Sequence, residues 1–292
     1  MDLSIVIVSW NVRDRLRECL QSIATTTSGT ALAREVFVVD NASSDGSAEL
    51  VEEEFPWVRC IRNTENLGFA AACNQAIRES HGTFVLLLNP DMRVLPGTLT
   101  GIVQFMREPR NARVGVAGGR LLDAHGVLVP HVRRFPTLRD QLAILLKVPH
   151  LVPAVLDHYL QRDFDYEREA QVDSIRGSFF CMQRACMDAI GLLDEDYFIW
   201  YEEVDFCRRA IDAGWMVAYT PTVTCVDYVG QSFRQTALFS KQRMMSRSMQ
   251  TYFAKHRPRW EWMIIAFLRP PLLAAVWCAD RMRVGNRAVR VS

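Results

Sequence analysis

The alternation of short apolar runs with helix-like segments in the first third of the chain constrains the fold more than any other feature. The apolar runs lie at residues 3–8, 36–39, 58–62 and 84–88. The helix-like segments between them cover residues 12–25, 47–53 and 69–79. Such runs are typical of strands buried on both faces of a parallel sheet. Because strands alternate with helices, the pattern predicts an α/β fold with a doubly wound, mostly parallel sheet flanked by helices.

The composition excludes several classes of protein. Of 292 residues, 49% are hydrophobic and 23% are charged, which excludes disordered and collagen-like chains. Lys and Arg number 34 against 33 Asp and Glu, and a net charge of +1 argues against nucleic acid as a partner. The eight cysteines include no Cys-x-x-Cys pair, which predicts reduced thiols in a cytoplasmic protein. The first residues lack a basic leader, so we expect no signal peptide.

Polar residues follow the predicted strands where each strand ends. Ser9 and Asn11 follow the first strand, Asp40 follows the second, and Asp91 follows the fourth. In doubly wound sheets, ligands bind beyond these carboxyl ends. No Gly-x-Gly-x-x-Gly or Gly-x-x-x-x-Gly-Lys sequence follows a strand, which disfavours dehydrogenases and phosphate-loop enzymes. Without a glycine cradle, phosphate charge is better neutralised by a divalent cation on carboxylates.

A series of ordered motifs then resembles glycosyltransferase family 2. The motifs lie at residues 4–11, 38–47, 66–74, 86–91, 176–180 and 193–210. The Asn-Pro-Asp sequence at residues 89–91 and the later motifs resemble the rhamnosyltransferase-like branch of that family. The resemblance implies a GT-A fold. It also implies an inverting transfer from a nucleotide-diphosphate sugar with a divalent cation, Mg²⁺ or Mn²⁺, as cofactor.

The resemblance also implies a donor site. Asp40 would bond to the pyrimidine base, and Asp91 would be a metal ligand in the family's Asp-x-Asp motif, whose first position is Asn89 here. The predicted donor-binding residues are Ser9, Asn11, Asp40, Asn66, Asn74, Asn89, Asp91, Ser232 and Arg234. Asn66 and Asn74 fit a role as helix caps or loop residues equally well. Asp227 occupies a position where the family often has His, and we hypothesise that it supplies the carboxylate missing at Asn89 as a second metal ligand.

An inverting transfer needs a base on the acceptor hydroxyl and charge relief on the leaving diphosphate. The family's acidic motif implies Glu203 as this base, with Glu202 as the alternative, and assigns Asp205 a structural role. Without the resemblance, these acids would be interpreted as a solvated helix start. The motifs further imply that Gly177, Ser178, Trp200 and Tyr201 lie on the acceptor side.

The C-terminal part of the chain has a different composition. Residues 233–292 contain twelve Lys and Arg but two Asp and Glu, and apolar blocks at 262–268 and 272–279 flank Arg269, Pro270 and Pro271. A spanning helix needs about 20 apolar residues, a central Arg costs about 2.5–3.5 kcal/mol, and prolines are expected to break the helix. We therefore expect a basic amphipathic tail in the membrane interface, with packing on the catalytic domain or on a homodimer partner as alternatives.

The predicted organisation is a GT-A catalytic domain at residues 1–238 and a helical tail at 239–292. The donor half covers about residues 1–115 and the acceptor half about residues 116–238. Short helices expected at residues 138–168 would flank the acceptor site. The resemblance implies transfer of rhamnose from deoxythymidine-diphosphate-rhamnose (dTDP-rhamnose), or of a hexose from a uridine-diphosphate donor, to a saccharide or lipid-linked saccharide in cell-envelope polysaccharide synthesis. The enzyme is then expected to be cytoplasmic and peripheral on the inner membrane. The alternative is a catalytically inactive nucleotide-sugar-binding or assembly subunit.

Overall fold

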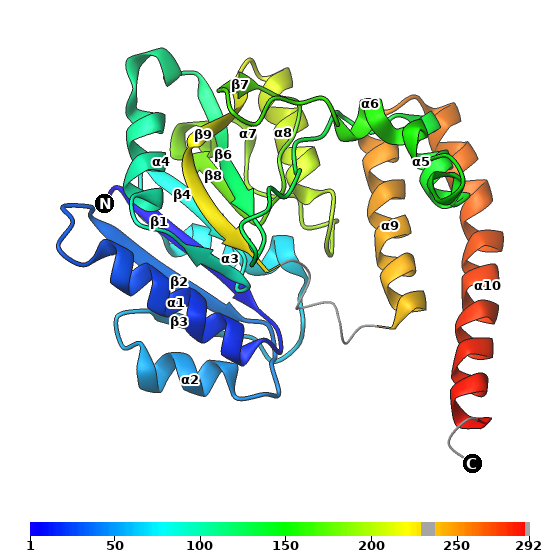
Figure 1. The fold of residues 1–292 in the computed structure, drawn as a ribbon, viewed down its shortest axis with the longest axis horizontal. Coiled ribbons are helices and arrows are strands. Elements are labelled where there is room, and N and C mark those ends of the chain that lie inside the picture. Colours follow the sequence, from blue (N-terminus) through cyan, green and yellow to red (C-terminus); the bar gives the residue numbers. More distant parts are fainter. Residues whose placement is uncertain (229–236, 290–292) are drawn as a thin grey trace.

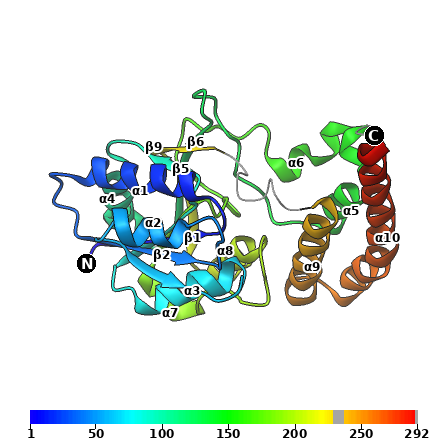
Figure 2. The ribbon, with the colours of Figure 1, turned by 90° about the horizontal axis from the view of Figure 1, so that it is seen from below.

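The computed structural model describes residues 1–228 and 237–289. It shows a body built around one sheet, with two long C-terminal helices along one side (Figures 1 and 2). In the described residues the strand order is β3-β2-β1-β4-β8-β6-β9-β5, and β7 pairs with β9 in addition. The predicted α/β class with a central sheet flanked by helices is confirmed.

The first half of the sheet is parallel, as predicted. Its strands are β1 (Leu3–Ser9), β2 (Arg34–Asp40), β3 (Arg59–Arg62) and β4 (Phe84–Leu88). The helices between them are α1 (Arg13–Thr27), α2 (Ser47–Glu54) and α3 (Phe69–Glu79). The register of β1 and β2 pairs Ser9 with Asp40 at the carboxyl ends of both strands. Two predicted donor residues therefore lie side by side.

The second half of the sheet mixes strand directions, where we expected mostly parallel pairing. Its strands are β5 (Met92–Val94), β6 (Val114–Leu122), β7 (Ala170–Gln171), β8 (Phe179–Gln183) and β9 (Met216–Asp227). β6 and β9 are parallel, whereas β8 is antiparallel to both β4 and β6, and β9 is antiparallel to β5 and β7. β8 runs backwards because the chain returns to the carboxyl end of β4, where the Asn89 N–H donates to the Ser178 carbonyl at 3.0 Å. This reversal brings residues 176–178 to the donor edge of the sheet.

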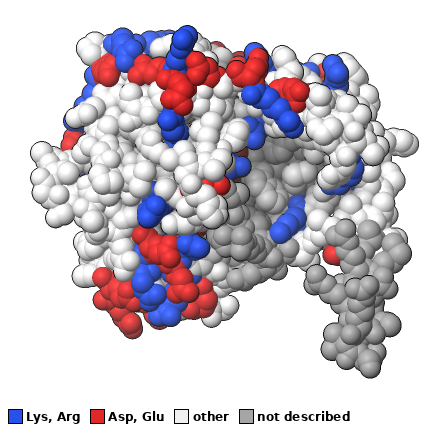
Figure 3. Space-filling view, viewed as in Figure 1, with Lys and Arg blue, Asp and Glu red and all other residues white. Residues whose placement is uncertain are grey.

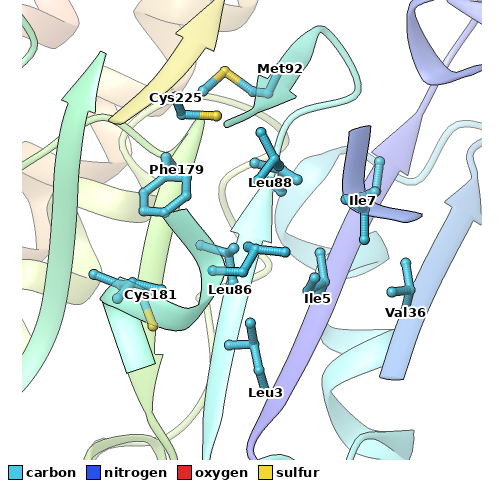
Figure 4. Packing of buried hydrophobic residues seen from close by; sticks show 14 of the residues in the cluster. Leu3, Ile5, Ile7, Val36, Leu86, Leu88, Met92, Phe179, Cys181 and Cys225 are labelled. Atoms are coloured by element: carbon cyan, nitrogen blue, oxygen red, sulfur yellow. The ribbon is translucent and has the colours of Figure 1, made fainter. Parts of the chain in front are cut away.

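The sheet is buried on both faces, which explains its apolar strands. In β1, Leu3, Ile5 and Ile7 belong to one hydrophobic cluster and Val6 to the cluster on the opposite face, as the two-residue period of a strand requires. Figure 4 shows how side chains of the first cluster from several strands pack together. Helices α4 (Thr98–Arg107), α7 (Arg184–Ile190) and α8 (Glu202–Asp212) also contribute buried residues to these clusters. This packing holds the strand ends in place.

The segment between β6 and β8 contains short helices, as predicted for residues 138–168. They are α5 (Leu138–Leu145), α6 (Asp157–Leu160) and two 3₁₀ turns, Val148–His150 and Pro153–Leu156; a further turn, Pro109–Asn111, precedes β6. α5 begins with a capping box in which Thr137 and Asp140 exchange side-chain and backbone hydrogen bonds. The cap fixes the start of a helix that contributes to the cavity described below.

The C-terminal part folds into α9 (Leu238–His256) and α10 (Arg259–Val289). A third hydrophobic cluster joins them to α5 and to the segment before α8; it contains Leu145, Tyr197, Tyr201, Met249, Tyr252, Phe253 and Ile265. The expected helix break at Pro270 and Pro271 is wrong, because α10 continues through both residues. Pro271 leaves the carbonyl of Phe267 without its helical donor. The Phe267 side chain is 80% exposed, so water can reach this side of the helix.

One side of α10 is apolar and exposed. Trp260, Met263, Phe267 and Trp277 all count among the exposed large hydrophobic residues. Within the described residues, one segment, Arg259–Cys278, is long and apolar enough to cross a membrane, with a mean hydropathy of 1.3 and 11% of its most apolar stretch buried. Figure 3 shows charged side chains gathered over the sheet-and-helix body and few on the described part of the C-terminal helices.

Candidate active site

The carboxyl ends of β1 and β2 form a buried polar edge of the sheet. Ser9 is fully buried and Asp40 is 4% exposed. One carboxylate oxygen of Asp40, Oδ2, accepts a hydrogen bond from the Ser43 N–H at 2.9 Å. Within the described residues, Ser9 Oγ and Asp40 Oδ1 are buried without a hydrogen-bond partner. Because buried polar atoms are nearly always paired, this pair of atoms marks a place where a polar ligand can bind.

Three predicted donor-binding asparagines hold loops at this edge. Asn11 has a φ of 54°, and its Oδ1 accepts a hydrogen bond from the Ser44 N–H at 2.7 Å. Asn66 Oδ1 accepts from the Gly68 N–H at 3.0 Å. Asn74 is 1% exposed, and its Nδ2 donates to the Leu193 carbonyl at 2.8 Å. These bonds shape the loops around the edge, and direct contact of the three side chains with a donor stays a prediction.

Gly68 shows how closely these loops approach the later motif. Its φ is 87°, and a Cβ there would lie 2.4 Å from the Phe198 carbonyl oxygen. The following N–H, of Phe69, donates to that same carbonyl at 2.6 Å. Any side chain at position 68 would therefore separate the α3 loop from the segment that precedes α8.

The predicted metal ligands lie at the ends of two paired strands: Asp91 directly precedes β5, and Asp227 ends β9. Asp91 and Asp227 are both nearly fully buried, at 3% and 2% exposure. Asp227 pairs in register with Met92, and the Tyr228 N–H donates to the Asp91 carbonyl at 3.1 Å. Ser178 connects this pair to Asn89, because Ser178 Oγ lies 3.3 Å from Asp227 Oδ2 and its carbonyl accepts from the Asn89 N–H. The predicted residues are thus brought to one edge.

The donor set at this edge fits a divalent cation. Within residues 1–228 and 237–289, no group of three or more His, Cys, Asp or Glu side chains could hold a metal ion by itself. Mg²⁺ is commonly held by one or two carboxylates together with substrate phosphates, and Asp91 and Asp227 supply two. Ser232 and Arg234, predicted to contact the diphosphate, lie outside the described residues.

The two candidate bases differ in their surroundings. Glu202 is 4% exposed and is not among the residues that line the cavity beside α8. Glu203 lines a cavity of about 250 Å³ and lies opposite Gly177, where a Cβ would be 3.7 Å from the Glu203 Cβ. Access to the cavity favours Glu203 as the residue that meets an acceptor hydroxyl.

Burial raises the pKa of both glutamates. For Glu202 the neighbouring Glu203 charge adds to the effect. For Glu203 backbone hydrogen bonds and the Arg176 guanidinium oppose it without cancelling it. Arg176 also donates to Asp227 Oδ2 at 3.1 Å. A carboxylate with a raised pKa is a stronger base than an exposed one, which suits proton removal from a hydroxyl.

Trp200 and Tyr201 border the same cavity. Both have left-handed backbones, with φ of 62° and 72°. Such conformations cost about 1–3 kcal/mol each and cluster at functional sites. The Tyr201 hydroxyl donates to Gln141 Oε1 in α5 at 2.7 Å. The predicted acceptor-side residues Gly177, Trp200 and Tyr201 are therefore assembled around Glu203.

A buried network centred on Asp205 lies behind this site, and its partner His256 was not predicted. Asp205 is 1% exposed and bonds to Arg209 Nε at 2.7 Å and to His256 Nε2 at 2.6 Å. Burial alone would raise the pKa of Asp205, but these partners outweigh it and the pKa is lowered. His256 is 51 residues from Asp205 in the sequence, so no local spacing indicates the pair.

The fold is that of GT-A glycosyltransferases. The structure is similar to the mannosyltransferase PcManGT of Pyrobaculum calidifontis, solved with GDP-Man and Mn²⁺, with a TM-score of 0.58 and 19% identity over 98% of this chain and 79% of that chain. It is also similar to TarS of S. aureus, residues 1–349, with a TM-score of 0.53 and 16% identity over 94% of this chain and 83% of that one.

The chain belongs to glycosyltransferase family 2, since the sequence model of "Glycosyl transferase family 2" matches residues 4–154. It is similar to the N-acetylglucosaminyl-diphospho-decaprenol L-rhamnosyltransferase of Mycobacterium tuberculosis, with 26% identity over 250 residues, 79% of this chain and 77% of the relative. It is similar also to rhamnosyltransferase WbbL of Escherichia coli, with 24% identity over 188 residues, 64% of this chain and 67% of the relative. The predicted family and its rhamnosyltransferase-like branch are confirmed.

Proposed function

We propose that this protein transfers a sugar from a nucleotide-diphosphate donor to a saccharide acceptor with inversion at the anomeric carbon. The observation that carries the proposal is the position of Glu203, which lines a cavity and lies opposite Gly177. Arg176, which lines the same cavity, donates a hydrogen bond to Asp227 at the sheet edge. A base on the acceptor side and carboxylates on the donor side are what a single displacement requires.

In this proposal, separate residues of the chain accept the proton, bind the nucleotide and hold the metal ion. The Glu203 carboxylate accepts the proton of the acceptor hydroxyl as that oxygen bonds to the anomeric carbon and the bond to the diphosphate breaks. Ser9 and Asp40 bind the nucleotide through their unpaired buried atoms. Asp91 and Asp227 would hold Mg²⁺ or Mn²⁺, which supplies positive charge to the leaving diphosphate when bound.

Rhamnose from dTDP-rhamnose is the proposed sugar and donor, with a uridine-diphosphate hexose as the second choice. The names of the relatives support this, because both are rhamnosyltransferases and one acts on N-acetylglucosaminyl-diphospho-decaprenol. The acceptor is accordingly proposed to be a lipid-linked saccharide in cell-envelope polysaccharide synthesis.

Metal-dependent nucleotide binding tests the function. Thymidine, uridine and guanosine diphosphates and their sugars, each with and without Mn²⁺ or Mg²⁺, are compared by thermal shift. We expect one pyrimidine nucleotide to raise the melting temperature when metal is present, since a ligand that binds the native state stabilises it. Asp91→Ala is expected to abolish the shift, because it removes one of two buried carboxylates at the edge.

The matched control is Asp188→Ala, an exposed acid on α7, which follows β8 at the opposite end of the sheet. It is expected to keep the nucleotide shift. A nucleotide shift without slow donor hydrolysis would favour the inactive nucleotide-sugar-binding subunit. No shift with any nucleotide in the presence of metal would remove the donor assignment.

We also propose that α10 lies in the interface of the cytoplasmic membrane leaflet, as a peripheral anchor. Exposed Trp260, Phe267 and Trp277 supply the apolar contact, and the Arg281 guanidinium lies 4.3 Å from the centre of the Trp277 ring. Aromatic and basic residues on one helix suit the boundary between acyl chains and anionic headgroups.

Vesicle sedimentation checks the anchor. The full chain is expected to sediment with phosphatidylcholine vesicles that contain phosphatidylglycerol and less with pure phosphatidylcholine, because basic residues gain from anionic lipid. The double variant Trp260→Ser, Phe267→Ser should lose most of this binding, and Trp57→Ser, at an exposed position before β3, should keep it. Equal sedimentation of all three proteins would contradict the anchor.

A further inference from the structure

Arg133 is a cation that lines the cavity of Glu203. It is partly buried, and among the described residues it makes no ion pair with a carboxylate. Within residues 1–228 and 237–289, its guanidinium donates to two backbone carbonyls, from Nη1 to Val132 at 2.8 Å and from Nη2 to Pro130 at 3.2 Å. Partial burial of a charge without a counter-ion is unfavourable, so an anion at this place would stabilise the protein.

The backbone holds Arg133 firmly at the cavity. Its N–H donates to the Ser174 carbonyl at 3.0 Å, and the Ser174 N–H donates back to the Arg133 carbonyl at 3.1 Å. This isolated β-bridge fixes the residue between the two segments that border the cavity. Arg134, the next residue, is exposed and does not line the cavity. The chain therefore offers a matched pair of adjacent arginines, of which Arg133 lines the cavity and Arg134 does not.

Arg176 adds a second positive charge at the cavity of Arg133. Arg176 lines the same cavity, and burial together with both arginines lowers the pKa of His131 to about 3, so this imidazole is neutral. His131 Nε2 lies 2.9 Å from the Gly119 carbonyl oxygen and donates to it. Tyr159 also lines the cavity; burial raises the pKa of its hydroxyl, the Arg133 charge opposes this shift, and the Glu203 charge adds to it. Arg133 and the proposed base, Glu203, therefore face the same cavity, where one ligand can contact both.

We propose that Arg133 binds a phosphate or diphosphate group of the acceptor. The acceptor sugar would then lie between Glu203, at its reacting hydroxyl, and Arg133, at its phosphate. The inference rests on the proposed function, since it assigns a substrate class to the same site. A guanidinium suits this role because its donors match phosphate oxygens in a bidentate arrangement.

The position of the cavity favours the acceptor over the donor as the source of this phosphate. Ser9, Asp40 and Asp91, the proposed donor residues, do not line it. It is bordered instead by Gln141 of α5 and Met245 of α9, the helices that pack with α10. Its volume of about 250 Å³ lies below the range of about 300–1,000 Å³ that encloses a whole ligand, so it suits one end of a long acceptor.

Calorimetry with farnesyl diphosphate, without metal or nucleotide, tests this inference apart from the transfer reaction. The native protein and Arg134→Gln are expected to bind it alike, and both should bind farnesol more weakly. Arg133→Gln should weaken farnesyl diphosphate binding about 10- to 100-fold, the factor for one hydrogen bond to a charged group. Its melting temperature and its farnesol affinity report whether the fold is intact.

A second arm separates the two sources of diphosphate. Thymidine diphosphate with Mn²⁺ should bind native protein and Arg133→Gln equally. If Arg133→Gln lost affinity equally for thymidine diphosphate and farnesyl diphosphate, Arg133 would be assigned to the donor and the proposal would be overturned. Equal binding of farnesyl diphosphate by all three proteins would also overturn it. So would the absence of farnesyl diphosphate binding by the native protein. Failure of the proposed function would show differently, as an absent metal-dependent nucleotide shift in a protein that still binds farnesyl diphosphate through Arg133.

Discussion

Glu203→Gln is expected to lower kcat about 10²- to 10⁴-fold while nucleotide-sugar affinity stays unchanged, because an amide of the same shape cannot accept a proton. Glu203 is the acid at the start of α8 that lines the cavity, and Gly177 leaves space beside its side chain. The measurement is the initial rate of transfer at saturating donor, with donor affinity determined separately by calorimetry.

Glu202→Gln is the matched control for this prediction. Glu202 is buried and does not line the cavity, so its variant should keep transfer within about tenfold of the native rate, below the loss expected for a base. The native rate should also fall with decreasing pH through a pKa above the ordinary glutamate value of about 4.3, since burial raises the pKa of Glu203. A larger loss in Glu202→Gln than in Glu203→Gln would reverse the two roles.

Asp205→Ala is expected to lower the free energy of unfolding by about 3–5 kcal/mol, because it leaves buried partners without their counter-charge. Asp205 is 1% exposed and receives hydrogen bonds from Arg209 and His256. Urea unfolding followed by circular dichroism measures the change. The control is Asp212→Ala on the same helix, whose pair with Arg208 is solvent-exposed, so a loss of about 0–1 kcal/mol is expected.

The pH dependence of stability provides an independent check on Asp205. Its pKa is lowered in the folded state, so its contribution is present above the unfolded-state value of about 3.9 and is lost as pH falls through the lowered folded value. The stability difference between native protein and Asp205→Ala should therefore shrink in acid. A difference that is constant from neutral to acidic pH would show that the ion pairs contribute nothing.

The parallel half of the fold could be predicted because its information is local. Each run of apolar residues, such as that of β1, is long enough to predict a buried strand. The polar residue at its carboxyl end directly follows the run in the sequence. The direction of β8 was not predictable in this way. It depends on a return of the chain that becomes visible only in the pairing of Asn89 with Ser178.

The candidate site shows the same division. Glu203 and Asp91 come from motifs that can be recognised in the sequence; Asp227 lies opposite Met92, and its role as a metal ligand stays a prediction. His256 and Tyr159 were not assigned a role, since each reaches the site across long-range contacts. The continuity of α10 through Pro270 and Pro271 was also missed, because local propensity does not account for helix packing.

The cluster that joins α9 and α10 to the rest of the protein bears on how this enzyme can be divided. Tyr197 and Tyr201, which lead into the helix of Glu203, bury their rings against Tyr252 and Phe253 of α9. Cutting the chain near residue 238 would strip the cover from these rings and from Asp205. The motif-bearing segment and the basic tail therefore form one cooperative unit, and exchange of tails between relatives requires their facing aromatic residues to be exchanged as well.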